Sequence, residues 1–64
     1  DFNLSKREVE VLELLKEGFD YNQIAEKLFI SPFTVRKHIE NIYKKLQVNN
    51  KMQAVQKATT NRII

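Results

Sequence analysis

Apolar residues recur every three or four positions in four short stretches of the chain, which is the spacing of amphipathic helices. Each stretch follows a residue type that caps helix N-termini, and these residues are Ser5, Asp20, Ser31 and Asn50. Gly18 supplies the left-handed conformation with which many helices end. The pattern predicts an all-α, four-helix domain with helices over about residues 6–17, 21–29, 32–47 and 51–59.

The second and third predicted helices are joined by about three residues, which favours the steep crossing of a helix-turn-helix over a relaxed hairpin. At about 100° per residue, one narrow seam of the third helix holds Val35, Ile39, Ile42 and Leu46. The opposite face is charged and carries Phe33, Lys37, Glu40 and Lys44, with Arg36 on one flank. In a recognition helix the first turns meet base edges and later turns approach phosphates, so this face predicts DNA contact; the alternative is an ordinary solvated face.

Composition narrows the remaining classes of function. The 64 residues include no cysteine and one histidine, which predicts a single domain without a disulfide, a metal site or a cofactor. Glu10, Glu13 and Glu17 line one side of the first helix, but no second histidine or glycine-rich loop accompanies them, so we expect a solvated face and no enzyme. No membrane span or signal peptide is apparent, and we expect a cytoplasmic protein.

Charge is distributed unevenly along the chain. Residues 1–20 contain three basic and six acidic residues, net −3, whereas residues 21–64 contain eight basic and two acidic residues, net +6. Such a separation is typical of nucleic-acid binders, although many basic surfaces share it.

Nearly the whole chain resembles the LuxR-type helix-turn-helix domains, also called the NarL/FixJ or GerE type. The residues that carry the resemblance are Leu4-Ser5, Arg7-Glu8, Val11-Leu12, Leu15, Gly18, Asn22, Ile24-Ala25, Leu28, Ile30-Ser31, Thr34-Val35-Arg36, His38, Ile42, Lys45-Leu46, Val48 and Ala54-Val55. The resemblance implies that residues 1–64 are a DNA-binding output domain of a bacterial transcription regulator, such as a two-component response regulator. It also implies a longer protein with an N-terminal receiver or ligand-sensing domain, and a first residue other than methionine agrees with this expectation.

Candidate DNA contacts follow from the helical wheel and from the resemblance together. Both assign base contacts to Arg36, Lys37 and Glu40, and the wheel adds Phe33, which either touches a thymine methyl group or folds back onto Phe29. Glu40 repels phosphate unless it accepts from cytosine N4 or orients Arg36 or Lys37. Contacts to the DNA backbone are expected from Lys44 and Lys45, from Asn22 and Thr34 as the resemblance implies, and from Ser31. The resemblance gives His38 mainly a supporting role.

The fourth predicted helix is too short for all of its larger residues to face the core. A homodimer that forms on DNA through this helix, as the resemblance also implies, is expected to use Met52, Val55, Gln56 and Thr59. The other expected partners are double-stranded DNA, the N-terminal regulatory domain and RNA polymerase. Glu8 falls on the apolar face of the first helix, where a carboxylate needs a cation, and Lys51 is the candidate.

Two other functions are compatible with the same residues. A σ-factor-like promoter-reading module presents a similar basic helix, but the run from Thr34-Val35-Arg36 to Lys45-Leu46 favours the LuxR type. A protein-interaction module without DNA binding would instead use the acidic side of the first helix or the apolar residues of the fourth.

Overall fold

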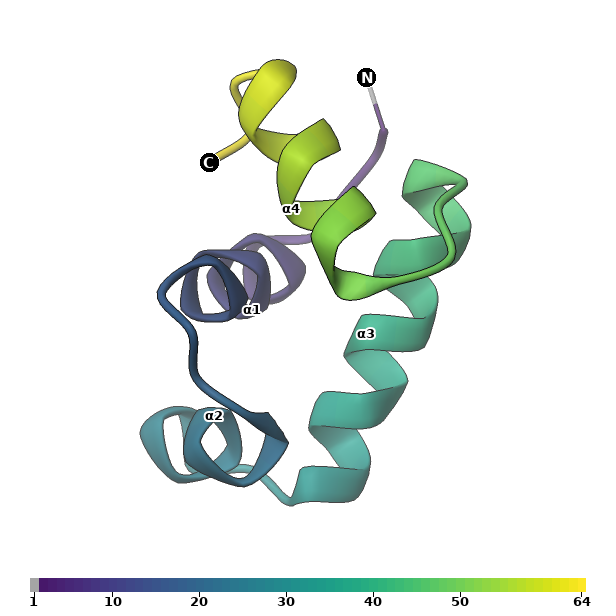
Figure 1. Ribbon diagram of the computed structural model, residues 1–64. Helices are drawn as coiled ribbons and strands as arrows, with labels where there is room; N and C mark the ends of the chain where they lie inside the picture. Colours follow the sequence, from purple (N-terminus) through teal and green to yellow (C-terminus); the bar gives the residue numbers. More distant parts are fainter. Residues whose placement is uncertain (1) are drawn as a thin grey trace.

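The computed structural model describes residues 2–64, which form four helices arranged around one core (Figure 1). The helices are α1 (Lys6–Lys16), α2 (Tyr21–Leu28), α3 (Pro32–Leu46) and α4 (Lys51–Thr60). No strand occurs among these residues, so the predicted all-α, four-helix fold is confirmed. The four helix starts agree with the predicted ones, and each helix end lies within one residue of its predicted position.

Side-chain caps fix where these short helices begin. The Glu8 N–H donates to Ser5 Oγ at 3.1 Å, and the Ser5 N–H donates to Glu8 Oε1 at 2.9 Å. Asp20 and Gln23 form the same reciprocal pair before α2, with both distances 2.9 Å. Because the first N–H groups of a helix have no partner within it, these capping boxes stabilise the first turns that the sequence predicts.

All four helices also end in the same way, with a left-handed residue followed by an apolar one. The left-handed residues are Gly18, Phe29, Gln47 and Arg62, with φ between 58° and 98°. After α2, the Phe29 N–H donates to the carbonyl of Glu26 and the Ile30 N–H donates to that of Ala25, which is a Schellman motif. The apolar residues that follow, Phe19, Ile30, Val48 and Ile63, pack against the core. A left-handed residue other than glycine costs about 1 kcal/mol or more, which this packing offsets at three of the four ends.

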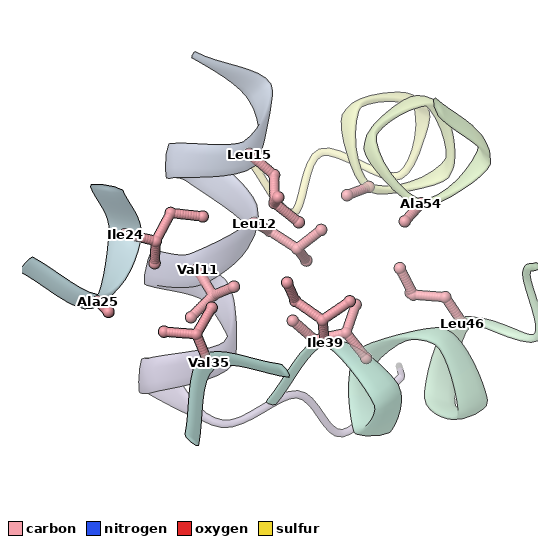
Figure 2. Close-up of a cluster of buried hydrophobic side chains, with 11 residues drawn as sticks. Val11, Leu12, Leu15, Ile24, Ala25, Val35, Ile39, Leu46 and Ala54 are labelled. Atoms are coloured by element: carbon pink, nitrogen blue, oxygen red, sulfur yellow. The ribbon is translucent and has the colours of Figure 1, made fainter. Parts of the chain in front are cut away.

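Side chains from all four helices meet in one buried cluster (Figure 2). The buried apolar residues are Val11, Leu12 and Leu15 of α1, Ile24 and Ala25 of α2, Val35, Ile39, Ile42 and Leu46 of α3, and Ala54 and Ala58 of α4. The predicted seam of α3 is therefore entirely inside, and α4 approaches closely through two alanines. Within residues 2–64, no helix combines the length and the apolar character needed to cross a membrane.

α2 and α3 form the predicted helix-turn-helix. Only residues 29–31 separate the two helices, and of these Phe29 ends α2 while Ser31 caps α3. α3 lies along one side of the molecule and packs against each of the other three helices (Figure 1). Its buried seam faces them, and its opposite face is exposed.

Candidate nucleic-acid interface

The outer face of α3 gathers the four side chains for which the sequence predicts base contact. Phe33 is 67% exposed, the side chains of Lys37 and Glu40 are 60% and 53% exposed, and Arg36 is also exposed. Phe29 is itself 93% exposed, so the rings of Phe29 and Phe33 do not pack on each other. Phe33 therefore stays on the outer face, available to a ligand.

Lys37 lies between an aromatic ring and a carboxylate on this face. Its Nζ is 5.9 Å from the centre of the Phe33 ring and 3.9 Å from Oε1 of Glu40. Phe33, Lys37 and Glu40 follow one another at positions i, i+4 and i+7 of α3, and we call these three residues the reading row. Exposed contacts of these kinds are each weak, so they orient Lys37 without withdrawing it from solvent.

Tyr21, for which the sequence pattern predicts no role, extends this surface onto α2. The guanidinium carbon of Arg36 lies 5.9 Å from the centre of the Tyr21 ring. Tyr21 is the first residue of α2 and is 39% exposed, so its ring steadies Arg36 from the neighbouring helix through a cation–π contact. An exposed aromatic residue at a helix start is the only signal of this role in the sequence.

The start of α3 forms a polar margin beside the reading row. The Thr34 N–H donates to Ser31 Oγ at 3.1 Å, and the two hydroxyl oxygens are 2.9 Å apart. Asn22 is exposed on α2 and lines a shallow hollow together with Pro32. The structure therefore brings Asn22, Ser31 and Thr34 to the same end of α3, although the two hydroxyl groups already bond to each other.

Lys44 and Lys45 are neighbours in the chain with different surroundings. Lys44 is exposed, whereas Nζ of Lys45 donates to Oε1 of Glu8 at 2.8 Å. The expected pairing of Glu8 with Lys51 is therefore wrong. The physical reason is that α3 packs across α1 and carries Lys45, near its C-terminal end, to the first turn of α1, whereas Lys51 begins α4.

Glu8 is the buried charged residue among the described residues, with 4% exposure. Burial by itself raises the pKa of this carboxyl, but the Lys45 ammonium and the hydrogen bonds from Lys45 and Ser5 outweigh burial and hold the pKa below its ordinary value. Glu8 is consequently ionised at neutral pH, where it joins the start of α1 to the end of α3.

The residues predicted for dimerisation lie along the exposed side of α4. Met52 is 78% exposed, Gln56 and Thr59 are exposed, and Val55 is half-buried. Met52, Val55 and Gln56 line an open, mostly apolar groove whose other wall is the end of α1, with Leu15 and Gly18. Thr59 lies on the same face of α4 but is not one of the residues that line the groove, and it donates its hydroxyl hydrogen to the Val55 carbonyl at 2.8 Å.

The single histidine, His38, does not belong to the reading row. His38 is half-buried on α3, beside the reading row rather than within it. Across residues 2–64, no three His, Cys, Asp or Glu side chains are grouped closely enough to hold a metal ion.

The short turn between α2 and α3 and the charged outer face of α3 define a helix-turn-helix domain of the kind that places its second helix in a DNA groove. The profile of the luxR family of bacterial regulatory proteins matches residues 2–58. The chain therefore belongs to this family.

Known members of the family are similar to the chain over nearly its whole length. It is 47% identical over 58 residues to the CsgBAC operon transcriptional regulatory protein of Escherichia coli, which covers 91% of this chain and 27% of that protein. It is 44% identical over 62 residues to the transcriptional regulatory protein LiaR of Bacillus subtilis, covering 97% of this chain and 29% of that protein. The crystal structure of the response regulator ChrA, from a heme-sensing two-component system, superposes with a TM-score of 0.93 at 46% identity, over 95% of this chain and 30% of that chain. The chain spans less than a third of each of these proteins.

Proposed function

We propose that this chain binds a specific sequence of double-stranded DNA with α3 in the major groove, as the output domain of a bacterial transcription regulator. The observation that carries the proposal is the exposed, cation-bearing face of α3, which lies directly opposite a fully buried seam. The major groove of B-DNA admits an α-helix, so the first turns of α3 can enter it without rearrangement of the core.

Within this proposal, the side chains divide into base readers and phosphate contacts. Arg36 and Lys37 donate to acceptors on base edges, of which guanine O6 and N7 are the strongest, and Phe33 contacts a thymine methyl group. The phosphate contacts are Asn22, Ser31, Thr34, Lys44 and Lys45. Lys45 keeps two further N–H donors for a phosphate after the one that it gives to Glu8.

DNA binding through these cations is expected to depend steeply on salt. If each domain neutralises on the order of three to five phosphates, log K should fall against log salt concentration with a slope of about −3 to −4.5. Fluorescence anisotropy with a labelled duplex at several salt concentrations measures this slope. An affinity that does not change with salt would contradict the proposal.

We further propose that two copies pair on DNA through α4 and the adjoining groove. Because a two-fold dimer reads an inverted repeat, sedimentation should find two domains on a palindromic duplex at saturation. Met52→Glu places a charge in the apolar groove and should reduce this to one domain per duplex, or weaken the second binding step about tenfold. Binding of the same variant to a single half-site is the control and should equal that of the wild type.

The relatives are more than three times as long as this chain, which supports a further domain in the same protein. We propose that a regulatory domain in the same protein controls this domain, that RNA polymerase is a further partner on DNA, and that the protein acts in the cytoplasm, where bacterial DNA lies.

A further inference from the structure

The reading row contains the one acidic residue of α3. Among the residues after Asp20, only Glu26 and Glu40 are acidic, in a chain whose net charge is +3. Glu40 nevertheless lies on the most exposed face of α3, with its carboxylate 3.9 Å from the Lys37 ammonium. The reading row is thus neutral overall, whereas the remainder of α3 carries Arg36, Lys44 and Lys45.

A carboxylate in the major groove needs a hydrogen-bond donor. It loses water there and lies between two rows of phosphates, so an unpartnered carboxylate weakens binding. The base edges in the major groove offer only two kinds of donor, the N4 amino group of cytosine and the N6 amino group of adenine. The ion pair with Lys37 lowers the cost of placing Glu40 in the groove, but this pairing is the same on every sequence, so any discrimination by Glu40 comes from the base edge that it faces.

The other end of the reading row has the opposite chemistry. Phe33 offers an exposed ring and no hydrogen-bonding group, and the apolar group on a base edge in the major groove is the thymine methyl. Phe33 and Glu40 are seven residues apart, which is about 10.5 Å along a helix, or the rise of about three base pairs.

We propose that the reading row selects half-sites that present a cytosine or adenine amino group to Glu40 and a thymine methyl group to Phe33 within about three base pairs of each other. Glu40 then acts as a specificity-determining residue, because it disfavours duplexes in which guanine or thymine, which present only acceptors as polar groups, takes the place of that cytosine or adenine on the strand that faces Glu40. This inference rests on the proposed DNA binding and adds to it the chemistry of the sequence that is bound.

Truncation of Glu40 tests the first half of the inference. A site is first selected with the wild-type domain from a random-sequence duplex library, and Kd values for that site and for random duplex are then measured at one salt concentration. Glu40→Ala should lower the ratio of specific to random affinity by about fivefold or more, mainly because random duplex binds more tightly. Glu13→Ala, which removes the same charge from the exposed side of α1, should leave the ratio unchanged. An unchanged ratio in Glu40→Ala would overturn the inference.

A second variant distinguishes the two amino groups. Glutamine pairs well with adenine through its amide but has no comparable pairing with cytosine. Glu40→Gln should therefore keep the wild-type preference at that base pair if Glu40 faces adenine, and lose it as Glu40→Ala does if Glu40 faces cytosine. The selection is repeated with the wild type, Glu40→Ala and Glu40→Gln. If the base preference at the pair assigned to Glu40 changes in neither of these two ways, the assignment of Glu40 is contradicted.

Replacement of thymine by uracil tests the second half, because it removes a single methyl group. At the base pair contacted by Phe33, uracil should weaken wild-type binding about three- to fivefold, the effect of one buried methyl group. Phe33→Ala should bind the two duplexes equally. Equal losses in both proteins would show that Phe33 does not contact the methyl group and would overturn this half.

Failure of this inference is distinguishable from failure of DNA binding itself. A wild-type domain that binds no duplex at low salt, while far-UV circular dichroism shows it to be helical, would overturn both. A domain that binds a selected sequence with a preference insensitive to Glu40 and Phe33 would overturn only the inference drawn from the reading row.

Discussion

Replacement of Glu8 by glutamine is expected to lower the free energy of unfolding at pH 7 by about 1.5 to 3 kcal/mol, the range for a hydrogen bond to a charged group. Glutamine keeps a side-chain acceptor for the Ser5 N–H but removes the charge that Lys45 pairs with at 2.8 Å. In a domain of this size the loss corresponds to a melting temperature lower by roughly 6 to 24 °C. Thermal unfolding followed by circular dichroism measures the change. The matched control is Glu10→Gln, whose exposed partner Arg7 is 3.5 Å away, with an expected loss below about 0.5 kcal/mol.

The pH dependence of stability provides an independent check on Glu8. Its pKa in the folded state is depressed, so its contribution to stability is complete above the unfolded-state pKa, near 4.5, and is lost as the pH falls through the folded-state value. The wild type should therefore be more stable than Glu8→Gln at pH 7, and the difference should shrink progressively below about pH 4.5. A difference that stays constant down to pH 2 would show that the charge on Glu8 does not stabilise the fold.

Two lysines of α3 are expected to affect DNA binding in different ways. Lys37→Ala should cost about 1 to 3 kcal/mol on the selected site and much less on random duplex, because Lys37 reads a base edge. Lys44→Ala should weaken both duplexes by similar factors and reduce the salt slope by about one unit, because a phosphate contact carries no sequence information. Affinities of both variants on both duplexes at two salt concentrations distinguish these roles.

A third lysine supplies the control for this comparison. Lys57 lies near the end of α4, with its ammonium group 5.4 Å from the centre of the Phe2 ring, so Lys57→Ala changes the net charge equally without altering α3. It should leave the ratio of specific to random affinity unchanged. If Lys37→Ala also leaves that ratio unchanged, α3 does not read bases through the assigned face.

The helix starts were predictable because they depend on neighbours in the chain. Ser5 and Asp20 need only a suitable residue three positions later to form a capping box. The residues that end the helices were less predictable than those that begin them, because Phe29 and Gln47 adopt a left-handed conformation that neither residue type favours. Their conformations follow from the packing of the next apolar residue on the core, which is a tertiary effect.

In the candidate interface too, features within one helix were predictable from the sequence, whereas contacts between helices were not. Positions that share a face of α3 follow from helical periodicity, and the structure places Phe33, Lys37 and Glu40 together as the wheel predicts. The Tyr21–Arg36 contact and the Glu8–Lys45 ion pair each join two helices, so they depend on crossing geometry that one sequence does not contain. For this reason the predicted pairing of Glu8 with Lys51 is wrong, and Lys45 is the partner instead.

Each of the three residues in the turn between α2 and α3 has a structural role. Phe29 closes one helix, Ser31 opens the next, and Ile30 between them is held by the core. Adding or deleting one residue there would prevent α3 from keeping both its Ser31 cap and the packing of Ile30 on the core. Because both ends of the turn are fixed by these contacts, we expect α2 and α3 to move together and the outer face of α3 to keep its shape. Control of such a domain is therefore external, by covering that face or by bringing two copies together, and not by bending the helix pair itself.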